Sequence, residues 1–219
     1  GRASIGATTG VCRRLEPTWR ACILTFLELV RSWALVPNKW KLGIVIPVFK
    51  SGSRADFGNY RPITLLNCDY KILARILNTR ILRVLKTAAA QDNTGFVPGR
   101  SILDNTRLLT LLQAAVEEEG KEGALIFLDF EKAFDTVSHE LLIEAIDRMG
   151  FGPDFKHWIG LLYHPDRKPM RRTVANGKRS AYWPVQRGVA QGCPLSPYLF
   201  ILIMHVMFFW DMKRDVEIE

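Results

Sequence analysis

Apolar residues follow the chain in two kinds of pattern, one with the period of a helix and one with short continuous runs. The helical period predicts helices over residues 17–33, 67–86, 101–119, 138–149 and 153–163, and from Ser196 onward. The runs at 43–49 and 124–129 are rich in aliphatic residues and predict strands. No internal repeat or low-complexity linker separates these segments, so we expect a mixed α+β fold.

Turn-forming residues refine this outline. Pro47 lies inside the run 43–49 and predicts an edge or bulged strand, because proline cannot donate a ladder hydrogen bond. Residues 50–59 have the composition of a hairpin tip. Asn176-Gly177 predicts a second hairpin, closed by a type I′ turn.

Charge is divided unevenly along the chain. The net charge is +8, but residues 1–116 carry 17 Lys and Arg against 6 Asp and Glu, whereas residues 117–219 carry 13 against 16. The strip 167–187 holds seven basic residues and no acidic one. This balance favours a polyanionic partner, with nucleic acid ahead of a membrane surface.

The sequence gives little support for a membrane span, a zinc site or secretion. The most apolar stretch, Tyr198 to Trp210, has 13 residues, and a membrane span needs about 20, so we expect a buried helix and no membrane partner. The four cysteines show no C-x-x-C spacing, which argues against zinc and for reduced thiols inside the cell. No signal peptide is visible.

Among single residues, Asp129 stands out because it ends the apolar run 124–128. A carboxylate there is costly to bury without a metal or another partner, although it could also cap the following turn. The histidines show no ligand spacing. We expect Ser138 to cap a helix, His205 to lie in the core, and the other three histidines to lie at the surface (His139, His157 and His164).

Several motifs occur together in one order. They are Asn59-Tyr-Arg-Pro-Ile63, Gly95-Phe-Val-Pro-Gly-Arg-Ser101, Leu128-Asp-Phe-Glu-Lys-Ala-Phe-Asp135 and Gln191-Gly-Cys-Pro-Leu-Ser-Pro197. From about Leu35 to Phe200 the chain resembles the reverse transcriptase of non-LTR (LINE-type) retrotransposons. The resemblance implies a right-hand polymerase fold with fingers and a partial palm but no thumb. Within one partial domain, 1–219, it implies a helical lead over 1–36, mainly fingers over 37–120, and partial palm over 121–219, with a basic hairpin at 167–187.

The resemblance also implies the parts of an active site. Asp129 would be the catalytic carboxylate and, with the carbonyl of Phe130, would bind two Mg²⁺ ions. Phe134 would select dNTP over NTP by excluding a 2′-hydroxyl. A register shifted by one would place Asp135 there, as in viral RNA-dependent RNA polymerases, and that alternative stays open.

Four further residues would bind the substrates. Lys50 and Arg61 resemble the fingers residues that hold the triphosphate, and an Arg fork with a Lys point charge suits phosphate oxygens. Gln191 and Gly192 would support the nascent base pair, and Arg100 would contact the template. The expected partners are therefore an RNA template, a DNA primer and dNTP.

One element of the resembling family does not occur. The chain contains no Asp-Asp dipeptide, and thus no aromatic-Ala-Asp-Asp box to complete the metal site. Two divalent ions about 4 Å apart repel by roughly 4 kcal/mol even in water, which Asp129 alone would not offset. We therefore expect a truncated domain that is inactive alone, with strand 124–129 lacking a neighbour.

Two alternatives remain: a non-catalytic RNA-binding remnant, and an intron-maturase-type reverse transcriptase. The Asn-Tyr-Arg-Pro-Ile form, with Glu131-Lys-Ala-Phe-Asp135, favours the retrotransposon branch over the maturase. By resemblance the protein would act in the nucleus, although no targeting signal is seen.

Overall fold

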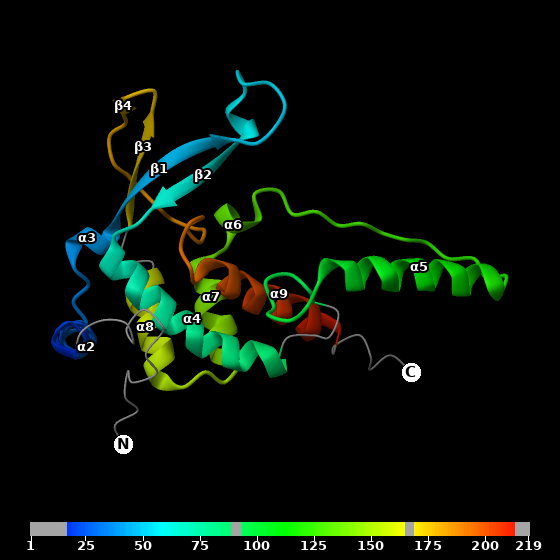
Figure 1. Ribbon diagram of the computed structural model, residues 1–219, viewed down its shortest axis with the longest axis horizontal. Helices are drawn as coiled ribbons and strands as arrows, with labels where there is room; N and C mark the ends of the chain where they lie inside the picture. Colours follow the sequence, from blue (N-terminus) through cyan, green and yellow to red (C-terminus); the bar gives the residue numbers. More distant parts are fainter. Residues whose placement is uncertain (1–16, 89–92, 165–168, 213–219) are drawn as a thin grey trace.

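A small sheet lies beside a group of packed helices, and one long helix extends away from both (Figure 1). The computed structural model describes residues 17–88, 93–164 and 169–212. The helices are α2 (Pro17–Trp33), α3 (Asn38–Lys41), α4 (Cys68–Ala88), α5 (Ile102–Glu118), α6 (Ala133–Thr136), α7 (His139–Arg148), α8 (Pro153–Tyr163) and α9 (Ser196–Met212), with a 3₁₀ turn η1 (Phe57–Asn59). The strands are β1 (Leu42–Phe49), β2 (Tyr60–Leu65), β3 (Met170–Ala175), β4 (Lys178–Arg179) and β5 (Trp183–Pro184). The expected α+β class is confirmed.

The sheet is mixed, with the order β2-β1-β3-β4 and β5 paired to β3. β1 pairs antiparallel with β2 and parallel with β3, so β1 is an interior strand over Leu42–Val45, where the expectation of an edge strand is wrong. Pairing with β3 ends at Val45, however, and Pro47 lies beyond it opposite Pro62. The missing proline N–H therefore costs no ladder bond to β3.

The helical core is built from the apolar faces of α4, α7, α8 and α9. The side chains of Leu77, Leu142 and Leu202 are fully buried in it, and Trp158 is 2% exposed. Such burial stabilises by roughly 1.5–3 kcal/mol per large apolar side chain. None of the described helices is long and apolar enough to cross a membrane.

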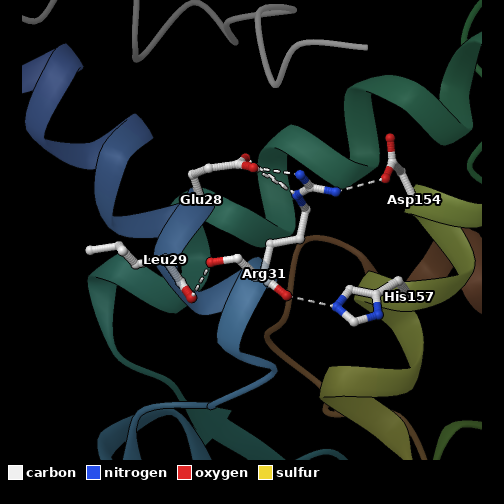
Figure 2. A network of polar contacts seen from close by, with 6 residues as sticks. Glu28, Leu29, Arg31, Asp154 and His157 are labelled. Atoms are coloured by element: carbon white, nitrogen blue, oxygen red, sulfur yellow. Dashed lines mark hydrogen bonds and ion pairs between the residues drawn. The ribbon is translucent and has the colours of Figure 1, made fainter. Parts of the chain in front are cut away.

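Helix α2 is held against α8 by polar contacts of Arg31 (Figure 2). Its guanidinium donates to Asp154 at 3.0 Å and to Glu28 on its own helix at 3.2 Å. Its carbonyl lies 3.0 Å from Nε2 of His157. Because these side chains are partly exposed, each ion pair contributes little, and the buried Leu27 and Val30 anchor the helix more strongly.

Helix α5 and the following segment form an arm, residues 101–130, that projects from the body (Figure 1). α5 has no buried residue, and its start is fixed locally by a capping box between Ser101 and Asp104. Residues 121–130 form no strand, and Phe127 is 80% exposed. The predicted strand 124–129 is therefore wrong for this structure, because apolar residues form a strand only where a neighbouring backbone pairs with them.

Two local predictions are confirmed. Ser138 caps α7, with its hydroxyl accepting from the N–H of Leu141 at 3.3 Å. Asn176 and Gly177 both have positive φ, 50° and 74°, and connect β3 to β4 as the type I′ turn requires.

Candidate active site

A cavity of about 1430 Å³ lies between one face of the sheet, the start of α6 and the loop before α9. Seven of the eight residues predicted to form the site line it: Lys50, Arg61, Asp129, Phe130, Phe134, Gln191 and Gly192. These residues come from three regions of the chain that are widely separated in sequence. Their meeting in one cavity is a property of the tertiary structure.

Arg100 is the exception, since it does not line the cavity. Its Nη1 donates to the carbonyl of Asn93 at 2.7 Å, in the turn that leads into α5. Its role at a template therefore stays a prediction.

The loop carrying Gln191 and Gly192 is fastened to strand β2. The N–H of Thr64 donates to the carbonyl of Gln191 at 2.6 Å. Gly192 has φ +114°, and a Cβ there would lie 2.6 Å from the Thr64 carbonyl oxygen. Glycine is thus required by the close approach of β2, in addition to any approach of a nucleotide.

The same loop is joined to the segment that follows Asp129. Nε2 of Gln191 donates to Oδ2 of Asp135 at 2.9 Å, linking the two predicted motifs directly. Burial raises the pKa of the Asp135 carboxyl above its ordinary value, while the bond from Gln191 and the charge of Lys132 act against that shift. Asp135 therefore positions the loop in this structure.

Backbone contacts complete the junction. The N–H of Gly188 donates to Val137, and that of Val189 to Phe134, both at 2.7 Å. His139 is buried, with Nε2 lying 2.9 Å from the Gly188 carbonyl, so its predicted surface location is wrong. A single histidine gives no sign in the sequence of whether it is buried. The position of His139 in the first turn of an amphipathic helix could have suggested its burial.

Phe134 reaches the cavity as part of an aromatic pair. Its ring stacks on Phe200 of α9 with centroids 5.2 Å apart and planes 18° apart. Such a pair contributes about 0.5–1.5 kcal/mol beyond its burial and restricts the ring to one orientation. Phe134 thus lines the cavity with its ring supported by Phe200.

Lys50 and Arg61 lie at the far end of the β1–β2 hairpin. The N–H of Lys50 donates to the Asn59 carbonyl at 2.8 Å, which closes the hairpin beside the two cations. Both side chains are exposed, and neither takes part in an ion pair within the described ranges. They are available to bind an anion.

The described residues do not form a complete metal site. Asp129 borders the cavity but lies on the exposed segment 121–130, and Phe130 is 45% exposed. No group of three or more His, Cys, Asp or Glu side chains within the described ranges could hold a metal ion. Asp129 and the carbonyl of Phe130 stay predicted ligands for Mg²⁺ without the further carboxylates that a pair of ions needs.

The cavity also contains groups that the sequence did not single out. Arg171 of β3 and Thr64 of β2 line it from the sheet, and Tyr163 and Ser196 line it from α8 and α9. The signal for Arg171 was present in the basic strip 167–187, but a strip does not reveal which of its side chains face inward.

Comparisons with known proteins agree with these motifs. Residues 48–216 match the family described as reverse transcriptase (RNA-dependent DNA polymerase). The chain is 37% identical over 165 residues to the 149 kDa protein of transposon TX1 from Xenopus laevis. It is 30% identical over 179 residues to the retrovirus-related Pol polyprotein from the type-1 retrotransposable element R2 of Popillia japonica. It is also 30% identical over 186 residues to the RNA-directed DNA polymerase from the mobile element jockey of Drosophila melanogaster.

The coverage of these three matches is uneven. They include 75%, 82% and 81% of this chain but only 12%, 25% and 20% of the respective relatives. The similarity therefore concerns one region of much longer proteins.

Proposed function

This chain belongs to the reverse transcriptase family, in the branch of the non-LTR retrotransposons, and we propose that it forms the fingers and the first part of the palm of an RNA-directed DNA polymerase. The observation that carries the proposal is the cavity that collects Lys50, Arg61, Asp129, Phe130, Phe134, Gln191 and Gly192. An RNA template, a DNA primer and a dNTP meet in it.

Each group has one task in this proposal. Lys50 and Arg61 hold the triphosphate as a point charge and a fork of donors. Phe134, kept in place by Phe200, borders the sugar of the dNTP and leaves no room for a 2′-hydroxyl. Gln191 and Gly192, fastened to β2 and to Asp135, support the nascent base pair.

In this proposal the metal site is incomplete in the described part of the chain. Magnesium would supply charge neutralisation at the phosphates when bound. Asp129 and the Phe130 carbonyl are its predicted ligands, and the described residues include no group of three or more His, Cys, Asp or Glu that could hold it. We therefore expect binding of primer–template and dNTP without nucleotide transfer.

Primer extension tests this proposal. The chain and its Asp129→Ala variant are mixed with an RNA template, an annealed DNA primer, dNTPs and Mg²⁺. We expect neither protein to extend the primer, while both bind the hybrid with a steep dependence on salt. Extension by the unaltered chain alone would overturn the proposed incompleteness, and failure to bind the hybrid would overturn the proposed function.

A second measurement distinguishes a polymerase fragment, which binds dNTP, from a remnant that binds only RNA. Binding of a fluorescent dNTP to the chain–hybrid complex should weaken roughly tenfold in Lys50→Ala and in Arg61→Ala, because each loses a charge-assisted contact. Arg54→Ala is the matched control, since Arg54 lies in the same hairpin but stacks on Phe49 at 4.7 Å. A chain that binds RNA but no dNTP would support the remnant instead.

The hypothesis of a non-catalytic RNA-binding remnant is tested because the described ranges lack a complete metal site. The intron-maturase alternative has less support, since the relatives named above all belong to transposable elements.

A further inference from the structure

Arg171 lines the cavity and has no task in the function proposed above. It lies on β3 opposite Gly43 of β1 in the parallel register. A Cβ at Gly43 would lie 2.8 Å from Cδ and 2.9 Å from Nε of Arg171. The glycine thus leaves the space in which the Arg171 side chain crosses the strand.

The guanidinium charge is not compensated within the described ranges. Nη1 donates to the carbonyls of Lys41 at 3.2 Å and Met170 at 3.0 Å, and no ion pair there includes Arg171. A guanidinium carries five N–H donors, so Nε and Nη2 keep three for a further ligand. Burial lowers the pKa of Arg171, as expected where a cation has lost water without gaining an anion.

Neutral hydroxyl groups lie at the same end of the cavity. Tyr163 and Ser196 line it and are 5% and 1% exposed. Both hydroxyl oxygens are fully buried, and the Tyr163 hydroxyl interacts with the side chains of Ser196 and Tyr70. These hydroxyls carry no charge that could balance Arg171, so a cation with donors left over suits an anion that accepts several hydrogen bonds.

The position of Arg171 indicates which anion. Arg61 pairs with Val48, five residues along β1 from Gly43, which corresponds to about 16 Å at 3.3 Å per residue. Because five is an odd number, the pleat of the sheet directs Arg61 and Arg171 to opposite faces. One nucleotide at Lys50 and Arg61 does not extend that far, whereas a polynucleotide does.

We propose that Arg171, placed by Gly43, binds a backbone phosphate of the nucleic-acid strand that enters the cavity, apart from the nucleotide held by Lys50 and Arg61. The proposal rests on the proposed function, because it assumes a primer–template in the cavity. It adds a binding residue that comes from the basic hairpin.

The neighbouring Arg172 provides a matched control. It has the same charge and lies on the same strand, but its guanidinium stacks on the Tyr182 ring at 4.1 Å and it does not line the cavity. Binding of a fluorescent RNA–DNA hybrid with a single-stranded RNA overhang is measured from 50 to 300 mM salt in Arg171→Gln and Arg172→Gln. We expect Arg171→Gln to weaken binding about five- to tenfold and to flatten the slope of log K against log salt by nearly one. Arg172→Gln should leave both unchanged.

Two more variants separate the contact from damage to the fold. Arg171→Lys keeps the charge and should keep the salt slope while losing about threefold in affinity, because the fork of donors is gone. Gly43→Ala alters no charge but displaces the Arg171 side chain, so it should reproduce the flattened slope. Thermal unfolding of each variant, followed by circular dichroism, reports whether it is folded at the temperature of the assay.

The outcomes are distinct from those of the proposed function. If the unaltered chain binds the hybrid and folded Arg171→Gln behaves like Arg172→Gln, this inference is wrong and the proposed function stands. If the unaltered chain does not bind the hybrid, the proposed function itself fails. A blunt hybrid shows which part of the nucleic acid Arg171 contacts. If Arg171→Gln weakens binding only of the hybrid with the overhang, the phosphate belongs to the single-stranded template. If binding of both hybrids weakens, the phosphate belongs to the duplex.

Discussion

The loop 185–193 and the segment 121–130 are both irregular and both carry motif residues, but their surroundings are opposite. Backbone hydrogen bonds of 2.6–2.7 Å join the loop to β2, to α6 and to Val137. Val189 within the loop is 1% exposed. The segment leaves Ile126 and Phe127 about four-fifths exposed, at 81% and 80%. An irregular backbone is thus positioned by the tertiary bonds that it makes, and a motif by itself does not position it.

The largest expected effect breaks the loop at its tightest contact. Gly192→Ala should destabilise the chain by about 3 kcal/mol, because the residue has φ +114° and the Thr64 carbonyl lies 2.6 Å from the added Cβ. Gly120→Ala, at φ +60° in the arm with nothing within 4 Å, should cost only about 1 kcal/mol. Urea unfolding of both variants measures the difference. Equal losses would contradict the contrast between loop and arm.

Packing of side chains should also differ between the loop 185–193 and the segment 121–130, with a smaller consequence for stability. Val189→Ala removes buried atoms beside Phe134 and should cost roughly 1–2 kcal/mol. Leu128→Ala removes a side chain that is 75% exposed and should change the free energy of unfolding by less than about 0.5 kcal/mol. The same urea titrations apply. A loss at Leu128 as large as that at Val189 would show that the segment 121–130 is packed in solution.

The smallest expected effect concerns the charge at the junction. Burial raises the pKa of Asp135 above its ordinary 3.8, so the folded state keeps the proton to higher pH than the unfolded state does. The resulting cost is absent well below pH 3.8, grows as pH rises through the shifted pKa, and is fully present at neutral pH. Asp135→Asn should therefore raise the melting temperature slightly at pH 7 and leave it unchanged at pH 3, as calorimetry at both values can check. A gain in melting temperature at pH 3 alone would show that ionised Asp135 does not destabilise the fold.

Local signals predicted much of the fold. The capping residues Ser101 and Ser138 and the turn Asn176-Gly177 act through bonds to backbone a few residues away, so the sequence nearby suffices to predict them. The family motifs likewise identified seven residues that line one cavity. These predictions required no knowledge of which distant segments meet.

Other predictions failed where distant partners decide the outcome. The apolar run 124–129 has the composition of a strand, yet no described backbone pairs with it. Pro47 predicted an edge strand, yet β1 is interior as far as Val45 because β3 arrives from more than a hundred residues further along the chain. His139 is buried because Gly188 accepts its hydrogen bond.

The helices, the hairpin turns, the basic first half and the motifs of a reverse transcriptase are all evident without the fold, because each depends on residues close together in the chain. Only the tertiary structure decided that Gln191 bonds to Asp135 and Thr64, that the arm lies exposed, and that Arg171 faces the cavity while Arg172 faces away. Strand pairing and register set the direction of every side chain on a sheet, and the partner strands come from segments that local patterns do not connect.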